Sequence, residues 1–170
     1  MYNPAFDTYN GIYRMLYIMK YLNMEKGMEV DRLRIFDYYL LFPYKIYKIH
    51  LKKTEATFKD LRKKVKCTRN PYNVSPNDRR FFERLRPYQM IALSHIASYG
   101  IISTELLLQQ KVKVVDADKM QMVISRLEKL PALEQNVLSW LSYCFRDTPL
   151  KGAYGLKYRT ELLEYKYDGC

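Results

Sequence analysis

Apolar residues recur along much of the chain with the spacing of an α-helix. Near the N-terminus they repeat at i, i+3, i+4 and i+7, which places them on one side of a helix; they are Ile12, Met15, Leu16 and Met19. This spacing predicts a helix from about Thr8 to Met24.

The next segment is apolar nearly all the way round. Asp31 stands in a favourable first-turn position, and Pro43 ends the segment. Its apolar positions are Leu33, Ile35, Phe36, Tyr38, Tyr39, Leu40, Leu41 and Phe42. We expect a helix that is buried in the fold or covered by a partner. Residues 44–51 alternate between apolar and polar, which fits either a strand or a continuing helix.

A short amphipathic helix is predicted next. Thr57 and Asp60 have the spacing of a weak capping box, and Phe58, Leu61 and Val65 form an apolar stripe opposite a row of lysines and arginines. Residues 70–78, rich in Asn and Pro, predict a loop that divides the chain into two halves.

The second half is predicted to be helical with one small ribbon. Pro87 is expected at the first position of a helix, with Gly100 just after its end. The predicted apolar stripe of that helix consists of Tyr88, Ile91, Ala92, His95, Ile96 and Tyr99.

Shorter elements complete this half. Ser103 is a candidate N-cap, and residues 111–115 alternate like a strand. Asp116 and Asp118 open a further helix, and Pro131 separates it from the last long one. The tail, 154–168, fits a helix or a strand equally well. The fold class is therefore mainly α with a minor β ribbon.

Length and composition limit the class of protein. With 170 residues the chain has the size of one compact domain, and its apolar runs are far shorter than the about 18 residues that cross a bilayer. Three widely spaced cysteines fit neither a disulfide framework nor a zinc cluster. We expect a soluble cytoplasmic protein with reduced thiols and no membrane contact.

Positive charge is concentrated in one quarter of the sequence. The net charge is +11, and residues 45–86 carry 14 basic against 4 acidic residues. Such a local excess attracts phosphate backbones or an acidic protein surface, and charge alone does not distinguish these two partners. A solvated surface helix would show the same pattern without any partner.

Catalytic motifs are absent from the sequence. There is no phosphate-binding glycine loop and none of the signatures HExxH and GxSxG. His50 follows the basic run and is expected to be solvated, whereas His95 is predicted to be a hydrogen-bonded core or interface histidine. We therefore predict a non-enzymatic protein with no catalytic residues, no cofactor and no metal.

Sequence-specific DNA reading is not favoured either. Residues 95–103 have the order helix, glycine turn, helix, but the would-be recognition helix begins with Ser103, Thr104 and Glu105 and offers no cation to the bases. The many tyrosines could stack on bases, but at helical spacing they more often form a core or an interface.

Several short stretches resemble one family. The segments Asn3-Pro4-Ala5-Phe6-Asp7, Tyr13-Arg14 and 31–43, followed late in the chain by 155–160 and Tyr167-Asp168, are similar to the middle components of bacterial ABC-three-component systems. The similarity covers nearly the full length.

This resemblance implies a small non-catalytic subunit, winged-helix-like in part, of a Lamassu-type antiviral and anti-plasmid defence complex. Its partners would be an SMC-like or Rad50-like ATPase and a nuclease effector, and it would bridge the ATPase while contacting double-stranded DNA non-specifically. The implied organisation is a single compact domain, 1–170, with an N-terminal helical half (1–69), a loop (70–78) and a winged-helix-like half (79–170). Two alternatives are a free-standing winged-helix transcription regulator and an enzyme with an unrecognised site.

Two sets of site residues follow. The predicted DNA-binding residues are Lys59, Arg62, Lys63, Lys64, Lys66, Arg69, Arg79 and Arg80. The predicted partner interface consists of Ile35, Tyr38, Tyr39, Phe42 and Arg159, of which the apolar members are expected to pack either the fold or a partner.

Overall fold

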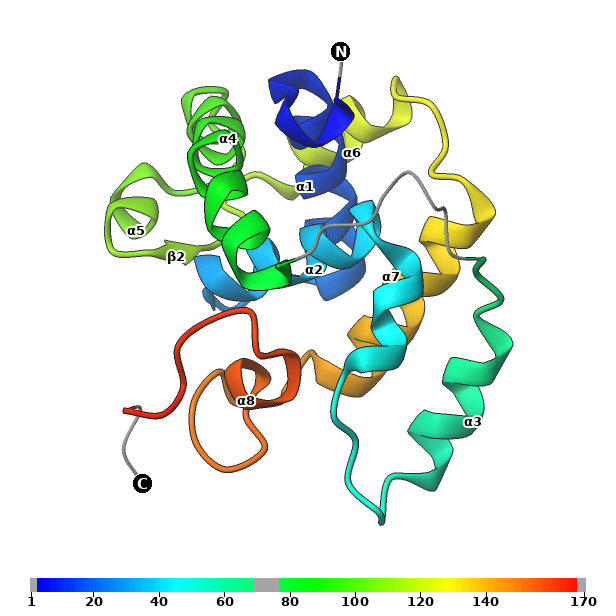
Figure 1. Ribbon diagram of the computed structural model, residues 1–170. Helices are drawn as coiled ribbons and strands as arrows, with labels where there is room; N and C mark the ends of the chain where they lie inside the picture. The colour runs from blue at the N-terminus through cyan, green and yellow to red at the C-terminus, as the bar shows by residue number, and fades with distance from the viewer. Residues whose placement is uncertain (1–2, 69–76, 168–170) are drawn as a thin grey trace. The chain divides into compact units, whose positions relative to one another are not determined.

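The structure, a computed structural model, describes residues 3–68 and 77–167 (Figure 1). Its contacts divide the chain into two compact units. Unit 1 comprises Met1–Asp37 and Arg84–Leu130, and unit 2 comprises Tyr38–Glu83 and Pro131–Cys170. Each unit combines a segment from before the predicted 70–78 loop with one from after it, so the contacts do not divide the chain at that loop.

The described residues are mainly helical, which confirms the predicted fold class. The helices are η1 (Pro4–Phe6), α1 (Thr8–Leu22), α2 (Val30–Leu41), η2 (Pro43–Lys48), α3 (Ala56–Lys64), α4 (Asp78–Ser98), α5 (Thr104–Leu108), α6 (Ala117–Ser125), α7 (Ala132–Phe145) and α8 (Leu156–Thr160). Strands β1 (Met28–Glu29) and β2 (Lys111–Val112) form an antiparallel ribbon in which Met28 is opposite Val112.

Unit 1 is built on α1, which begins and packs as the sequence predicts. The Asp7 carboxylate accepts a hydrogen bond from the Asn10 backbone N–H at 2.8 Å, so it caps the helix. Gly11 lets α4 approach closely, because a Cβ at this position would lie 3.2 Å from the Cβ of Ala92. Helix α6 lies against α1, and the Tyr17 hydroxyl donates to the Glu128 carbonyl at 2.8 Å.

Helix α4 begins earlier than predicted. It starts at Asp78, so Pro87 lies inside the helix and not at its first turn. The error arose because residues 78–86 are mostly polar and hide the apolar period. A helix tolerates an internal proline at the cost of one i→i−4 hydrogen bond, because the φ angle of proline is compatible with helix. The end of α4 was predicted correctly: Gly100 has φ 79°, and the Ile101 N–H bonds to the Ile96 carbonyl.

The buried face of α4 is also different from the predicted stripe. Phe82, Leu85 and Leu93 are fully buried, whereas Ile91 is 46% and Tyr99 68% exposed. His95 is exposed, so the core alternative is wrong and the interface alternative stays a prediction. Phe82 and Leu85, in the polar-rich segment that the sequence pattern did not assign to the helix, are therefore part of its buried face.

Unit 2 contains the basic helix, α3, which contacts α7. The Trp140 indole N–H of α7 donates to the Phe58 carbonyl at 3.0 Å and joins the two helices. Thr57 is not a cap, because α3 begins at Ala56 and its N-cap residue, Glu55, makes no side-chain cap hydrogen bond. Residues 43–48 form a 3₁₀ helix, which is neither the strand nor the continuing α-helix considered above.

The remaining short elements follow the sequence closely. The Ser103 hydroxyl accepts from the Leu106 N–H at 3.2 Å, and the Asp116 carboxylate accepts from the Lys119 N–H at 2.9 Å, so both predicted caps are present. In the tail, the helical alternative is correct for residues 156–160. Residues 70–76 of the predicted loop lie outside the described residues.

Candidate functional site: the basic surface of unit 2

Four lysines of the predicted DNA-binding set come from α3 and the turn after it. The side chains of Lys63, Lys64 and Lys66 are exposed, and Lys59 is half-buried. Lys63 lies 3.0 Å from the Asp60 carboxylate on the same helix, in a pair that is largely solvent-exposed. Exposed pairs of this kind contribute little, so Lys63 remains available to an external anion.

Arg62 is half-buried, and its side chain makes hydrogen bonds within the fold. Its guanidinium donates to the carbonyls of Ile46 and Ile49 at 3.3 and 3.1 Å, and it lies over the rings of Tyr47 and Trp140. Burial lowers the pKa of this arginine. The sequence pattern placed Arg62 opposite the apolar stripe, so its inward role was not predicted.

Two further arginines of the set stand at the start of α4. Arg79 and Arg80 are exposed, and Arg79 makes an exposed ion pair with Glu164 at 2.9 Å. A hydrogen bond from Arg79 lowers the pKa of the Glu164 carboxyl. Arg69 lies outside the described residues. All described members of the predicted set therefore belong to unit 2.

Lys45 contributes to the net charge of the chain, but it is not part of the exposed basic surface. It is buried, its ammonium donates to the Tyr38 hydroxyl at 2.9 Å, and it pairs with Asp78. Asp78 also binds the exposed Lys48 at 3.0 Å. Hydrogen bonds from these two lysines outweigh burial and lower the pKa of the Asp78 carboxyl, whereas burial raises the pKa of Tyr38.

The predicted partner interface lies inside the fold. The exposed fractions of its five residues are between 0% and 6%; they are Ile35, Tyr38, Tyr39, Phe42 and Arg159. Of the two roles considered for the apolar members, packing the fold is the one that the structure shows. A role in partner binding stays a prediction, and it would require side chains that the chain itself now covers.

Arg159 is a buried clamp of unit 2. Two of its nitrogens donate to the two oxygens of Glu55 at 2.9 and 2.8 Å, and the same side chain reaches the carbonyls of His50 and Tyr154. This bidentate geometry fixes the chain before α3 against α8. The hydrogen bond from Arg159 lowers the pKa of Glu55.

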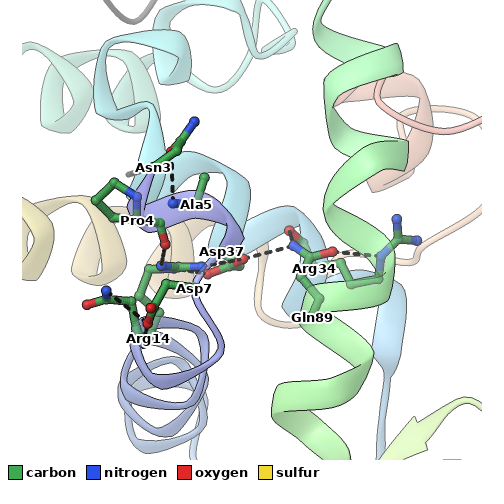
Figure 2. A network of polar contacts seen from close by, with 9 residues as sticks. Asn3, Pro4, Ala5, Asp7, Arg14, Arg34, Asp37 and Gln89 are labelled. Carbon is green, nitrogen blue, oxygen red and sulfur yellow. Dashed lines mark hydrogen bonds and ion pairs between the residues drawn. The ribbon is translucent and has the colours of Figure 1, made fainter. Parts of the chain in front are cut away.

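Unit 1 contains a second buried polar network (Figure 2). Asp37 is fully buried and accepts from Arg14 at 2.5 Å and from the Gln89 amide at 2.9 Å. Gln89 accepts from Arg34 at 3.0 Å, and Arg14 also reaches the carbonyl of Pro4. The network thus ties α1, α2, α4 and the N-terminal turn together. In the sequence, its signal is the presence of charged residues such as Arg34 and Asp37 within a largely apolar helix, where the apolar pattern predicts only packing.

The next side chains to consider are those that could bind a metal ion or act as nucleophiles. His50 is exposed and lies 3.4 Å from Glu161, and no group of three or more His, Cys, Asp or Glu side chains within 3–68 and 77–167 could hold a metal ion. Burial raises the pKa of the Cys144 thiol to about 12, which keeps it protonated and unreactive at neutral pH.

The second helix of the candidate helix-turn-helix is poorly suited to reading DNA bases. Its second helix, α5, has only five residues, Thr104–Leu108, and carries Glu105 in its first turn. A recognition helix needs side chains long and basic enough to reach base edges.

Within the described part of the chain, no helix is both long and apolar enough to cross a membrane.

Comparison with known proteins places the chain in one family. No curated protein and no solved structure matches it. The family model described as ABC-three component (ABC-3C) system Middle Component 5 matches residues 1–168. This match spans both units and includes the segments that hold the two arginine networks and the basic surface. The chain therefore belongs to the family of ABC-three-component system middle components.

Proposed function

We propose that the chain is a non-catalytic accessory subunit of a bacterial defence complex. It would bridge an SMC-like or Rad50-like ATPase in a complex that also contains a nuclease effector, and it would contact the phosphate backbone of double-stranded DNA non-specifically. The proposal rests on family membership for the assembly and on the basic surface of unit 2 for the DNA.

The observation that carries the DNA contact is the uneven distribution of charge. Unit 2 has 17 basic and 9 acidic residues, a net charge of +8, while unit 1 has 12 and 9, a net charge of +3. Carboxylates inside the fold neutralise some of these cations, but the lysines of α3 and the arginines of α4 named above face solvent. An exposed cationic cluster on one unit is what a phosphate backbone requires.

The residues proposed to meet phosphates are those of the predicted set that the fold leaves exposed or half-exposed. They are Lys59, Lys63, Lys64, Lys66, Arg79 and Arg80. Arg62 supports α3 from the inside, and Arg69 stays a prediction. Phosphate contacts position a protein without reading sequence, so binding is expected to be independent of DNA sequence and to weaken steeply with salt.

The experiment is a titration of fluorescent duplex DNA with the purified chain at several salt concentrations. The logarithm of the binding constant should fall linearly with the logarithm of salt, with a slope of about −0.9 for each phosphate contacted. A salt-independent affinity would reject the DNA contact. Co-purification with the other components of its system tests the assembly, and a chain that elutes alone would reject that part.

A free-standing winged-helix regulator is less well supported. It would need a recognition helix, and α5 is short and begins with an acidic turn. Such a regulator would also prefer one DNA fragment over others of equal length, which the same titration would reveal.

A further inference from the structure

Helices α3 and α7 leave a groove on the surface of unit 2. It has a volume of about 540 Å³ and is lined by Thr57, Leu61, Lys64, Val65, Asn136, Ser139, Trp140 and Tyr143. This volume falls within the range of specific binding sites. The groove uses a different side of α3 from the one that carries Lys59 and Lys63.

The walls of the groove are held in place before any ligand arrives. The Trp140 indole is fixed to the Phe58 carbonyl at 3.0 Å, and the Tyr143 ring stands edge-to-face against the Phe58 ring at 6.0 Å. Phe145 makes the same kind of contact with Phe58 at 6.1 Å. A preformed groove costs little ordering entropy on binding, which favours its use as a docking site.

The chemistry of the lining suits one face of an amphipathic helix. Leu61, which is half-buried, and Tyr143, which is 65% exposed, offer the accessible apolar surface, and Val65 and Trp140, at 4% and 3% exposed, form the floor beneath them. Aromatic residues of this kind often dominate the binding energy of interfaces. A groove between two packed helices is the usual receptor for apolar anchors at i, i+3, i+4 and i+7.

The positive charge at the groove favours a negatively charged partner. Lys64 is the only charged residue among those lining the groove. Lys64 is exposed and, among the described residues, makes no ion pair within 4.0 Å, so it can meet a carboxylate. Duplex DNA would need several cations in place of the apolar floor. A second copy of this chain, at +11, would be repelled.

We infer that the groove between α3 and α7 binds an acidic amphipathic helix of another component of the system. The apolar stripe of that helix packs on Leu61 and Tyr143, above the floor formed by Val65 and Trp140, and a flanking carboxylate pairs with Lys64. This inference rests on the proposed function in one respect, that other components assemble with the chain; it does not depend on DNA binding.

The test uses the full chain expressed together with the other components. A photo-crosslinking benzoylphenylalanine replaces Tyr143, and in a control it replaces Tyr9, which is 68% exposed on unit 1. Mass spectrometry then identifies the crosslinked peptide. The expected product joins position 143 to an acidic, amphipathic segment of another component, with no such product from position 9.

Two charge reversals provide a matched comparison on the same helix. Lys64→Glu should reduce recovery of the partner about tenfold, whereas Lys63→Glu, on the side of α3 away from the groove, should leave recovery within about twofold. On α7, Tyr143→Ala should also reduce recovery about tenfold. Both lysine variants should also weaken DNA binding, because each removes one of the cations of α3 proposed to meet phosphates.

The outcomes separate the two proposals. A complex that forms normally but gives no crosslink from position 143, or whose recovery falls equally for Lys63→Glu and Lys64→Glu, overturns the groove alone. Crosslinks to DNA or to a second copy of the chain overturn it as well and identify the true occupant. A chain that assembles with no other component contradicts the proposed assembly and the groove together.

Discussion

Both units pair their buried cations with buried or half-buried polar groups, but the two units differ in their excess of basic residues. In unit 1, Arg14 and Arg34 are buried beside Asp37 and Gln89, and in unit 2 Arg159 and Lys45 are buried beside Glu55 and Asp78. Only unit 2 has a large excess of basic residues, +8 against +3. The comparison teaches that a count of cations mixes two kinds of residue, those that hold the fold together and those that remain available to a partner.

The largest expected effect comes from breaking the buried network of unit 1. Asp37→Ala leaves Arg14 buried without its carboxylate, which should lower the free energy of unfolding by about 3–5 kcal/mol. Urea denaturation measures it, with the exposed Asp118→Ala as control. A loss below about 1 kcal/mol would mean that this network does not stabilise unit 1 as its geometry indicates.

The second prediction concerns the exposed cations of unit 2. Reversing Lys63, Lys64 and Lys66 to Glu together should weaken binding to duplex DNA about a hundredfold, and the salt slope should become shallower. The control reverses the exposed lysines of unit 1 at positions 20, 26 and 113, which is the same change in net charge. Equal losses in both variants would show that total charge matters and the location on unit 2 does not.

A smaller effect should appear in the pH dependence of unit 2. Arg159 lowers the pKa of Glu55 in the folded chain, so this pair stabilises the fold above the unfolded pKa of about 4.3 and the contribution is lost as the pH falls through the folded pKa. Glu55→Gln should therefore destabilise the chain at pH 7 by about 1–3 kcal/mol.

The destabilisation of this variant should be smaller at pH 3 than at pH 7, because the ion-pair contribution of Glu55 decreases as the pH falls toward its lowered pKa. Thermal unfolding at the two pH values measures both differences. An equal destabilisation at pH 7 and pH 3 would assign the effect to packing and not to the ion pair.

The smallest effect is expected from an exposed pair. Asp60→Asn removes the partner of Lys63 on α3 and should change the free energy of unfolding by less than about 0.5 kcal/mol. It also removes a negative charge from the basic surface, so affinity for DNA should rise about two- to threefold. Unchanged or weaker DNA binding would place the phosphate contacts away from Lys63.

Helix positions were predictable where apolar periodicity is local. The start of α1, the stop of α2 before Pro43 and the caps at Ser103 and Asp116 depend on neighbours within four residues, so the sequence contains what decides them. The start of α4 could not be predicted in this way, because its first turns are polar and Phe82 and Leu85 are buried by residues distant in sequence.

The candidate site was predictable only in part. The basic cluster was visible as charge density, and the exposed positions of Lys63, Lys64 and Lys66 agree with it. The inward role of Arg62 and the groove beside Tyr143 depend on how α3 packs against η2 and α7, which lie up to about 80 residues away in the chain.

The amino-acid sequence by itself determined the helical class, the caps at Ser103 and Asp116, the family and the place where positive charge collects. These depend on hydrogen bonds and apolar spacing within a few residues, or on composition, and need no long-range contact. The tertiary structure decided which cations are buried with a carboxylate and which face solvent, because desolvation and ion pairing are set by neighbours that only the fold brings together. Arg62 and Lys63, adjacent in sequence, show the division: one donates to buried carbonyls, and the other faces solvent.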